Sequence, residues 1–560
     1  MFALSLRDKI NMMDMKKKLF FILLIAFIHS FNAYSQEEDK GFEMSKNLEI
    51  FSSVYRNIHT NYVDDINPGD LVKTAIDAML YKLDPYTNFI PESDIENVKL
   101  QLLGQYGGIG ALIHQQNGMV VISEPYENLP AYKAGLRAGD IILEVNGNST
   151  KDRNSDEVRE FLRGQAGSQI SIKVLRGGKE IEKKFTREEI TLENVPYYGM
   201  VSNDIGYIKL NEFTNNASRN ILSAFKELKK SNSLKGLIID LRGNGGGLLN
   251  EAVDIVNIFV EKGQSIVSTK GKISQKNQTF KTNYSPYDLN IPLIILVDGA
   301  SASASEIVAG SLQDLDRAVI MGQRTFGKGL VQNIIPLTYN TQLKVTVSKY
   351  YIPSGRCIQA IDYSHRDEEG RANKVPDSLK KEFKTKRGRV VYDGFGIEPD
   401  IVLEREYTSP IIYPIITKFL AFDFATKFVN ENPSIALPKE FEISDEIYNQ
   451  FLDFIKDKDY TYSTISERTL DELEKTALRE KYSEDIMNEI KIIRAKFEED
   501  KKNDLIKFKD EIKEVLLSEI VVRYHNQKGR IEALLKNDKE VIEAIKLLDN
   551  QEKYNKILGK

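Results

Sequence analysis

Cysteine and histidine, the residues that sulfur chemistry and imidazole metal sites require, are scarce in this sequence. Only one of the 560 residues is cysteine, Cys357, so the chain can form neither an internal disulfide nor a cysteine zinc cluster. The five histidines are scattered, without the i, i+4 spacing that places two of them on one face of a helix. We therefore expect no metal and no other cofactor.

An excess of one charge is also lacking. The 77 basic and 82 acidic residues give a formal net charge of -5, so electrostatics offers no reason to propose nucleic acid as a partner. A composition of 41% hydrophobic and 28% charged residues is typical of globular proteins that bury a core. At roughly 150 residues per domain, this length predicts three or four domains.

Long hydrophobic runs are absent except near the N-terminus. Three lysines at 16–18 precede LFFILLIAF, and a small-x-small site follows at 33–35, which is the pattern of a secretory signal peptide. The run is short for a membrane span, and no later stretch is apolar enough for one. We predict that residues 1–35 are a signal peptide cleaved near Gln36 and that the protein is exported to the periplasm or cell envelope. The alternative is an uncleaved signal that keeps the protein at the membrane.

The region 43–97 is expected to be helical. Apolar residues recur with helical periodicity up to a Pro-Gly break at Pro68, and a second helix follows to about Leu83. This predicts a small helical hairpin that ends in the segment LDPYTNFI. We expect it to have a structural role.

Short strands with glycine turns fill residues 98–188. A helix that stops at a glycine, an alternating strand and an Asn-Gly hairpin signal follow a glycine-rich entry. This order resembles a PDZ domain. Backbone amides of Gly107, Gly108, Ile109 and Gly110 could then hold a terminal carboxylate while the next strand pairs with an extended peptide. The alternative is a β domain without a ligand.

Residues 189–406 alternate strands and helices, with continuous apolar strands such as GLIID and LIILV that predict a sheet covered on both faces. We interpret 365–393 as a charged, solvated insertion. Residues 407–560 are helical and heavily charged, and could contact an adaptor or a second copy of the chain. The fold class is therefore a multidomain combination of α/β and α+β parts.

Three loops follow strands of the α/β region: DLRGNGGG, VDGASASASE and MGQRTFGKGLVQ. Ligands of open α/β sheets bind outside the carboxyl ends of the strands, and helix N-termini there offer oxyanion donors. The third loop resembles a nucleotide-binding P-loop, but the Ser or Thr that binds Mg²⁺ is replaced by Gly329 and a strand follows instead of a helix. We therefore reject an NTPase.

A serine nucleophile in the second loop needs a base, and no histidine is near. Lys328 can serve if burial lowers its pKa by roughly 3 units. Apolar neighbours are available in Phe326, Leu330 and Val331. In an extended segment Gln332 points to the same side as Lys328, where it can hold the amine by a hydrogen bond.

The stretch GASASASEIVAGSLQDLDRAVIMGQRTFGKGLVQ resembles the signature of the carboxy-terminal processing (tail-specific) peptidases. The PDZ-like region, the DLRGNGGG loop and YYIPSGRCIQ agree, so that the resemblance covers about 45–405. It implies a crotonase-like, ClpP-type layering of the core and a Ser–Lys dyad. By this resemblance Ser303 is the nucleophile, Lys328 the base and Gln332 the supporting residue.

The same resemblance implies oxyanion donors at the backbone amides of Ala304 and of one glycine of the GNGGG loop, for which we choose Gly246. It also implies a regulatory role for Arg163. Ser301 and Ser305 are then loop and helix-capping residues. The expected function is an exported serine endopeptidase for unstructured C-terminal tails. Two alternatives are a non-catalytic PDZ scaffold that binds tails and a hydratase-like acyl-binding enzyme.

Overall fold

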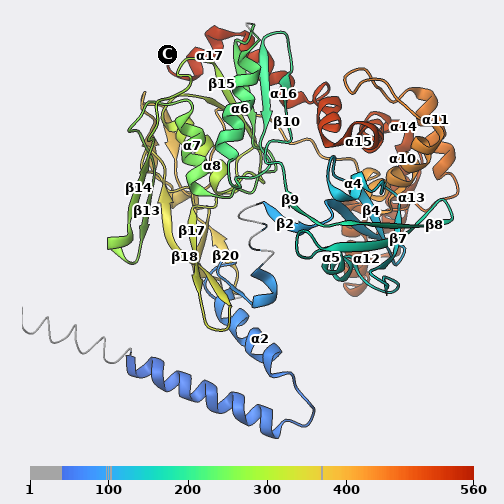
Figure 1. The fold of residues 1–560 in the computed structure, drawn as a ribbon, viewed down its shortest axis with the longest axis horizontal. Helices are drawn as coiled ribbons and strands as arrows, with labels where there is room; N and C mark the ends of the chain where they lie inside the picture. The colour runs from blue at the N-terminus through green and yellow to red at the C-terminus, as the bar shows by residue number, and fades with distance from the viewer. Residues whose placement is uncertain (1–40, 96–97, 99, 101–103, 232, 368–369) are drawn as a thin grey trace, which may run out of the picture. The chain divides into compact units, whose positions relative to one another are not determined.

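The computed structural model describes residues 41–560 except 96–97, 99, 101–103, 232 and 368–369 (Figure 1). The predicted signal peptide, residues 1–35, lies outside the described residues. The chain divides into two compact units, Met1–Lys82 and Leu83–Lys560. None of the helices in the described ranges combines the length and the apolar character needed to cross a bilayer.

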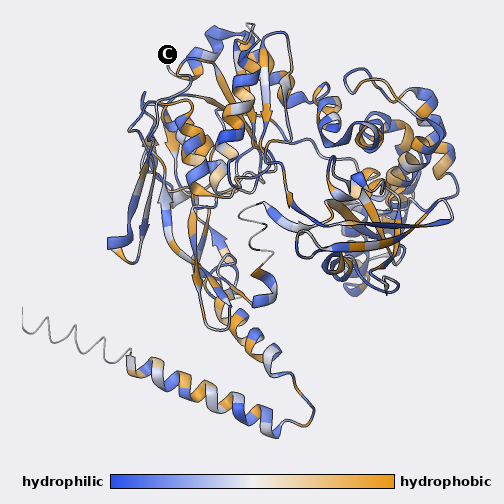
Figure 2. Ribbon diagram, viewed as in Figure 1, coloured by the Kyte–Doolittle hydropathy of each residue, from blue (hydrophilic) through white to orange (hydrophobic). Residues whose placement is uncertain are grey.

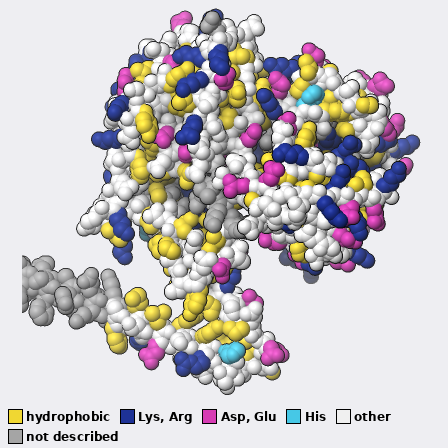
Figure 3. Space-filling view, in the orientation of Figure 1, with side chains coloured by type: hydrophobic (Ala, Val, Ile, Leu, Met, Phe, Trp, Pro, Cys, Tyr) yellow, Lys and Arg dark blue, Asp and Glu magenta, His cyan; other side chains and the backbone are white. Residues whose placement is uncertain are grey.

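The first unit contains the two predicted helices. A helix over 41–61 is followed by α2 (Pro68–Tyr81), which begins at the proline because the missing N–H of that residue costs nothing in a first turn. The side chain of Asn67 caps α2 by accepting from the Gly69 amide at 2.9 Å. Hydrophobic and polar residues alternate along the first helix (Figure 2), and Figure 3 shows hydrophobic side chains on the surface of this part of the chain. Phe51 and Val54 are two of the exposed apolar residues.

The PDZ-like region is a sheet of short strands flanked by two helices, as predicted. The strands, in their order across the sheet, are β3 (Ala111–Gln116), β4 (Met119–Pro125), β5 (Ile141–Val145), β7 (Gln169–Arg176) and β8 (Lys179–Thr186), with β6 (Asn148–Ser149) paired to β5. The helices are α4 (Pro130–Lys133) and α5 (Ser155–Leu162). The Asn-Gly turn between β5 and β6 has positive φ at both residues, 49° at Asn146 and 80° at Gly147, which suits a tight hairpin.

The predicted peptidase region, residues 189–406, is built on a six-stranded sheet. Its strands, in spatial order, are β10 (Tyr197–Met200), β11 (Ile205–Lys209), β12 (Gly236–Asp240), β15 (Leu293–Val297), β16 (Val319–Gly322) and β23 (Ile401–Val402). Every neighbouring pair is parallel except β10 with β11. Three helices connect these strands: α6 (Ala217–Lys229), α7 (Leu249–Asn257) and α8 (Ala304–Asp314).

Both faces of this sheet are covered, and by parts of the chain that are far apart in sequence. Ile239 and Ile295 belong to the core cluster that includes α6, α7 and α8. Their neighbours Ile238 and Ile294 point the other way, since side chains alternate along a strand, and pack with the last two helices, α16 (Lys539–Asp549) and α17 (Gln551–Ile557). The C-terminal end of the chain therefore completes the core of the peptidase region.

A second, antiparallel sheet lies in the same unit. Its strands are β1 (Asn88–Ile90), β18 (Gln342–Tyr351), β13 (Ser265–Gly271) and β14 (Gln278–Lys281), with β17 (Leu330–Pro336) also paired to β18. Outside both sheets, β2 (Gln105–Gly108) pairs with β9 (Glu188–Thr191) where the chain enters and leaves the PDZ-like region. Short 3₁₀ helices occur at Glu92–Asp94, Ser274–Lys276 and Asp377–Leu379.

The charged insertion forms two small antiparallel pairs, β19 (Ile361–Arg366) with β20 (Ala372–Lys374) and β21 (Glu382–Lys384) with β22 (Val390–Tyr392). The prediction that residues 365–393 are a solvated insertion is wrong at Arg389. That guanidinium contacts Asp316 Oδ1 at 2.6 Å and Asp400 Oδ1 at 2.5 Å, and both carboxylates are nearly inaccessible. The insertion is thus tied to the end of α8.

The C-terminal region is helical, as predicted. Its helices before α16 are α9 (Ile412–Thr417), α10 (Leu420–Glu431), α11 (Asp445–Ile455), α12 (Ile465–Arg479), α13 (Glu484–Lys501), α14 (Asp504–Lys507) and α15 (Lys509–Leu535). It packs on the PDZ-like sheet, where the His114 ring stacks on Phe419 at 4.2 Å and Gln116 donates to the Asp423 carboxylate at 3.1 Å. A kink at Asn526, with φ 55°, lets α15 bend back toward the peptidase sheet.

Candidate active site

The three serines of the loop before α8 differ in their surroundings. Ser301 and Ser305 are fully buried, and their hydroxyls donate to the backbone carbonyls of Leu241 and Asn244 at 2.8 and 2.9 Å. Ser303, between them, is half-buried. Of the three hydroxyls, that of Ser303 is therefore the one available to a substrate.

The backbone of Ser303 adopts a conformation that a side chain disfavours. Its φ is 56° and its ψ is -110°, at the N-cap position of α8. Such strain at a non-glycine residue persists only where the surroundings enforce it, and it clusters at active sites. The position also places the serine directly before the free amides of a helix N-terminus.

A buried carboxylate holds the Ser303 loop to the Lys328 loop. Glu306 is fully inaccessible to solvent, and its Oε2 accepts from the backbone amides of both Ser303, at 2.8 Å, and Lys328, at 2.9 Å. Its Oε1 accepts from the Thr325 hydroxyl at 2.6 Å and the Gly327 amide at 2.7 Å. Burial raises the pKa of this carboxyl group, and the four donors oppose that rise. Two loops separated in sequence are thereby fixed side by side.

Tyr350 of β18 makes a second link between the same loops. Its hydroxyl lies 2.8 Å from the carbonyl oxygen of Lys328 and 3.1 Å from that of Ser303. Because the amides of Ser303 and Lys328 share Glu306 and their carbonyls share Tyr350, the two residues lie next to each other at the carboxyl end of the sheet.

The Lys328 amine is shielded from water and lacks an acidic partner. Burial, helped by the nearby positive charge of Lys344, lowers its pKa from 10.5 to about 8. Its Nζ lies 4.2 Å from the centre of the Tyr86 ring, and within the described chain it makes no hydrogen bond and no ion pair. Phe326, which the sequence suggested as an apolar neighbour, is 46% exposed, so most of the shielding comes from elsewhere.

Gln332 lies on β17 beside this site. Its side-chain amide donates to the Thr346 hydroxyl at 3.1 Å across the β17–β18 pair. Since no hydrogen bond joins Gln332 to Lys328 in the described chain, its role as an orienting group for the amine stays a prediction.

The glycine-rich loop after β12 reaches Ser303 at Gly246. A Cβ added there would lie 2.8 Å from Ser303 Cβ and 3.0 Å from the Ala304 nitrogen, so only glycine fits. The amide of Gly246, however, donates to the Asn244 side chain at 2.9 Å. The Ala304 amide, at the first position of α8, donates to no described group. Of the two predicted oxyanion donors, Ala304 is free for that role and Gly246 is already engaged.

The PDZ-like region has a groove between β3 and α5. This cavity of about 190 Å³ is lined by Gly108 and Ile109 but not by Gly107 or Gly110. Gly107 instead belongs to β2 and pairs with β9, where a Cβ would meet the Gly164 carbonyl oxygen at 2.1 Å. The amides of Ile109 and Gly110 have no acceptor among the described residues.

Arg163, the predicted regulatory residue, lies at the C-terminal end of α5 and lines the same groove. Its guanidinium stands over the Tyr106 ring, 5.6 Å from the ring centre, and 3.8 Å from the carboxylate of Glu160. The structure thus places Arg163 beside this groove, and none of its described contacts is with Ser303.

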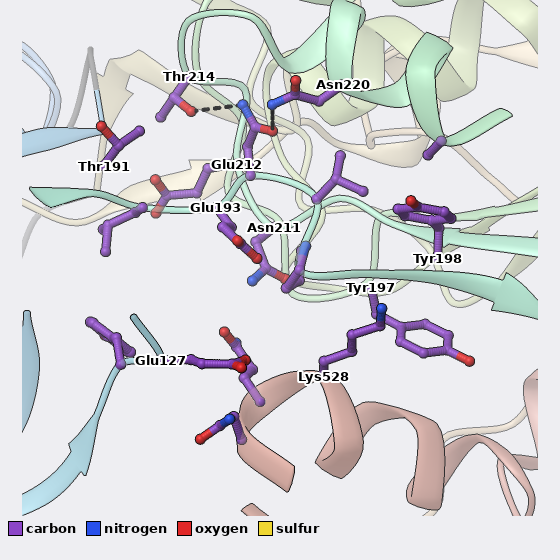
Figure 4. A pocket seen from close by; sticks show the side chains of 18 of the residues that line it. Glu127, Thr191, Glu193, Tyr197, Tyr198, Asn211, Glu212, Thr214, Asn220 and Lys528 are labelled. Carbon is purple, nitrogen blue, oxygen red and sulfur yellow. Dashed lines mark hydrogen bonds between the residues drawn. The ribbon is translucent and has the colours of Figure 1, made fainter. Parts of the chain in front are cut away.

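A larger cavity of about 810 Å³ opens where the PDZ-like region, the peptidase region and the α15 kink meet (Figure 4). Its wall is rich in carboxylates, and burial raises the pKa of Glu193 and of Glu212. Asn194 bridges the wall by donating to Thr214 and accepting from Asn220, at 3.2 and 2.9 Å (Figure 4). The described residues that line it include neither Ser303 nor Lys328.

Nothing in the described part of the chain gathers three or more residues of the kind that hold a metal ion. The polar groups that link the Ser303 and Lys328 loops are the Glu306 carboxylate, the hydroxyls of Thr325 and Tyr350 and backbone amides, whereas the Ala304 amide donates to no described group. Their arrangement suits acyl transfer, in which a hydroxyl attacks a carbonyl and an amine moves the proton.

The fold defines an α/β peptidase with a PDZ domain before its core sheet and a helical domain after it. Peptidase family S41 matches residues 204–364, the PDZ domain family matches 121–176, and the C-terminal helical domain of probable PDZ-proteases matches 411–548. The chain belongs to the carboxy-terminal-processing proteases of peptidase family S41. The predicted resemblance is confirmed, and the helical region that it left out is part of such proteins too.

Two curated relatives illustrate this membership. The carboxy-terminal-processing protease of Bartonella bacilliformis is 35% identical over 353 residues, which cover 62% of this chain and 81% of that protein. A probable CtpA-like serine protease of Staphylococcus aureus is 35% identical over 314 residues, covering 56% and 62%. Among solved structures, the photosystem II D1 C-terminal processing protease is 28% identical, covers 63% of this chain and 92% of its own, and has a TM-score of 0.35.

Sequence reasoning missed two residues of this site, Glu306 and Tyr86. Glu306 follows Ser303 by three positions, which is the capping-box spacing S-x-x-E and could have drawn attention to it. Tyr86 had no such signal, because it lies more than two hundred positions before Lys328 and reaches it only through the pairing of β1 with β18.

Proposed function

We propose that this protein is an exported serine endopeptidase that captures the free C-terminus of an unstructured polypeptide in its PDZ domain and cleaves the chain with a Ser303–Lys328 dyad. The observation that carries the proposal is the sharing of one carboxylate, Glu306, by the amides of Ser303 and Lys328. Such a reaction requires a nucleophile and a shielded amine, and one carboxylate here binds the backbone of both residues.

In the proposed reaction, the Ser303 hydroxyl attacks the scissile carbonyl while the neutral Lys328 amine accepts its proton. The negative charge that develops on the carbonyl oxygen is met by the Ala304 amide at the start of α8 and by a second donor from the GNGGG loop, which we assign to Gly246. Each such donor contributes roughly 3–4 kcal/mol. The Gly246 amide must then exchange its bond to Asn244 for one to the oxyanion. The protonated amine gives its proton to the departing amine, and water activated by Lys328 hydrolyses the acyl-enzyme, with Gln332 as the supporting residue.

Tail recognition is assigned to the groove between β3 and α5. Ile109 and Gly110 are buried, and their amides have no acceptor among the described residues. Because buried amides are almost always hydrogen-bonded, an anionic acceptor bound here would be stabilised. A terminal carboxylate supplies one, while β3 offers its edge to the residues before it. Gly107 and Gly108 support this loop by their close backbone packing, and Arg163 stands where it can couple an occupied groove to the rest of the enzyme.

Blocking the carboxylate of the substrate is expected to slow cleavage about tenfold or more. The comparison uses one unfolded reporter peptide with a free and with an amidated C-terminus, and a charge-assisted hydrogen bond lost from the groove sets the size of the effect. The measurement is kcat/KM for both peptides, with Ser303→Ala as the inactive control. Equal rates for the two peptides would contradict tail capture. Binding of the free tail without cleavage by the wild type would favour the non-catalytic scaffold.

Export rests on the N-terminal pattern of lysines, apolar run and small residues. The mature protein is expected to begin near Gln36 and to be recovered from the envelope fraction. N-terminal sequencing of the purified protein from its native host checks this directly. A protein that keeps residues 1–35 and sediments with membranes would show instead that the segment acts as an anchor. Adaptor binding or self-association through the C-terminal helices is the further partner proposal.

A further inference from the structure

The segment LDPYT, which precedes β1, lies against the hairpin formed by β17 and β18. β1 pairs with β18, with Asn88 opposite Lys344. Asp84 accepts from the amides of Tyr86 and Thr87, both at 2.8 Å, which closes a tight turn. Thr87 Oγ1 accepts in turn from the Thr346 amide at 3.1 Å. The position of Tyr86 is therefore set by the sheet and not by a flexible tail.

Within this turn, the Tyr86 ring faces the Lys328 amine. The distance from Nζ to the ring centre is 4.2 Å, well inside the range of a cation–π contact. Tyr86 also meets Tyr363 edge-on, with 6.0 Å between ring centres and an angle of 90°, and the Tyr363 hydroxyl donates to the Tyr86 hydroxyl at 3.4 Å. The ring thus contacts both Tyr363 and the amine.

A π face distinguishes the two protonation states of a lysine. It attracts an ammonium ion and has little attraction for a neutral amine, and as an apolar surface it also excludes water. During acylation the O–H bond of Ser303 breaks, an N–H bond forms at Lys328, and positive charge appears at Nζ. No acidic side chain pairs with Nζ among the described residues, so the ring is the group placed to stabilise that charge.

Resting on the proposed function, we propose that Tyr86 is a positioning residue of the dyad, which shields the Lys328 amine and stabilises the ammonium that forms when Ser303 is deprotonated. It takes the place that a carboxylate holds in a serine–histidine–aspartate triad, without adding a full negative charge. A carboxylate there would keep the lysine protonated and thus inactive as a base. The aromatic ring avoids this.

The other charges around Nζ act in both directions. Lys344 on β18 lowers the pKa of Lys328, whereas Asp84 in the turn and Glu306 on α8 raise it, and burial has the largest effect. Burial also raises the pKa of the Tyr86 hydroxyl, so the ring stays neutral over the working pH range. Substitutions at Tyr86 therefore change the ring and the burial of the amine, while these neighbouring charged side chains stay in place.

The test is a series at Tyr86 with pH–rate profiles for cleavage of an unfolded reporter. Tyr86→Phe keeps the ring and is expected to retain most of the wild-type rate. Tyr86→Leu keeps an apolar cover but no π face, and its plateau kcat is expected to fall about tenfold. Tyr86→Ala also admits water, so its rising limb is expected to move up by about one pH unit. Tyr407→Leu, at a tyrosine that is 88% exposed, is the matched control.

The outcomes separate this inference from the proposed function. If Ser303→Ala cleaves as fast as the wild type, the dyad itself is wrong. If Ser303→Ala is inactive and Tyr86→Leu keeps both the wild-type plateau and the wild-type pH profile, Tyr86 has no positioning role. If Phe fails as badly as Leu, the hydroxyl and not the ring matters, which also overturns the inference. Thermal unfolding of each variant shows whether a lost rate reflects lost folding, and the Phe and Leu variants decide the question if Ala does not fold.

Discussion

Lys328→Arg is expected to lower the rate of cleavage by at least about 10³-fold, although arginine keeps the positive charge and most of the length of lysine. The reason is that a guanidinium stays protonated at every working pH and cannot accept the proton of Ser303. Lys328→Met, which removes the charge, is expected to be equally inactive. The measurement is single-turnover acylation with an unfolded reporter, together with binding of its C-terminal tail, which should remain.

The matched control is Lys349→Met, at an exposed lysine on β18, in the hairpin that follows Lys328, which is expected to behave like the wild type. If Lys328→Arg is active, the residue supplies charge or shape and another group is the base. If Lys328→Met loses tail binding as well, the substitution disturbs more than the dyad. The loss of activity then does not support the assignment of Lys328 as the base.

The pH dependence of the wild type follows from the same role. Only the neutral amine can act as a base, so activity is low below the pKa of Lys328, rises through it and levels off above it. With that pKa lowered to about 8, the half-maximal rate is expected near pH 8 and not near 10.5. Lys344→Gln removes a neighbouring positive charge that disfavours the ammonium, and should move the half-maximum to higher pH.

Glu306→Gln is expected to reduce kcat by about 10²-fold or more and to destabilise the fold by about 2–5 kcal/mol. The four donors that meet this carboxylate need four acceptor sites, and a carboxamide offers acceptors on only one of its two ends. Two donors are then left facing an NH₂ group. Because the amides of Ser303 and Lys328 share one oxygen of this side chain, the two loops are expected to shift relative to each other.

A suitable control for this substitution is Glu251→Gln. Glu251 also accepts bonds at the start of a helix, from the Asn216 amide and from the amide and hydroxyl of Ser218, in a place without contact to the dyad. It is expected to lose stability and keep its turnover number. If Glu306→Gln is destabilised to a similar degree but turns over normally after refolding at low temperature, the carboxylate holds the fold and not the catalytic register.

Much of the site was accessible from local sequence. The order of strands, glycine loops and helices predicted the α/β core and the PDZ domain, because periodicity and turn chemistry act over a few residues. The resemblance to the tail-specific peptidases singled out Ser303, and the structure leaves this residue half-buried while both flanking serines are bound to backbone carbonyls. The expectation that Ser301 or Ser305 caps the helix is wrong, because Ser303 itself is the N-cap of α8 and Ser305 lies inside the helix. The same resemblance indicated Lys328 as its partner.

The environment of Lys328 was not accessible in this way. Its own neighbours in sequence suggested Phe326 as a cover, but that ring is largely exposed. The cover comes from Tyr86, in a segment expected to be only structural. Strand pairing between β1 and β18 brings the two together, and pairing across such a separation leaves no trace in a local pattern.

The sequence alone determined which residues can do chemistry here and which elements carry them, since residue type, helical capping and strand alternation are local properties. The tertiary structure decided which surfaces those elements cover. The last helices, α16 and α17, have an apolar face that any hydrophobic surface could satisfy, and only the folded chain shows them on the second face of the peptidase sheet. Likewise, only packing lowers the pKa of Lys328, because desolvation depends on every group that surrounds the amine and not on its neighbours in the chain.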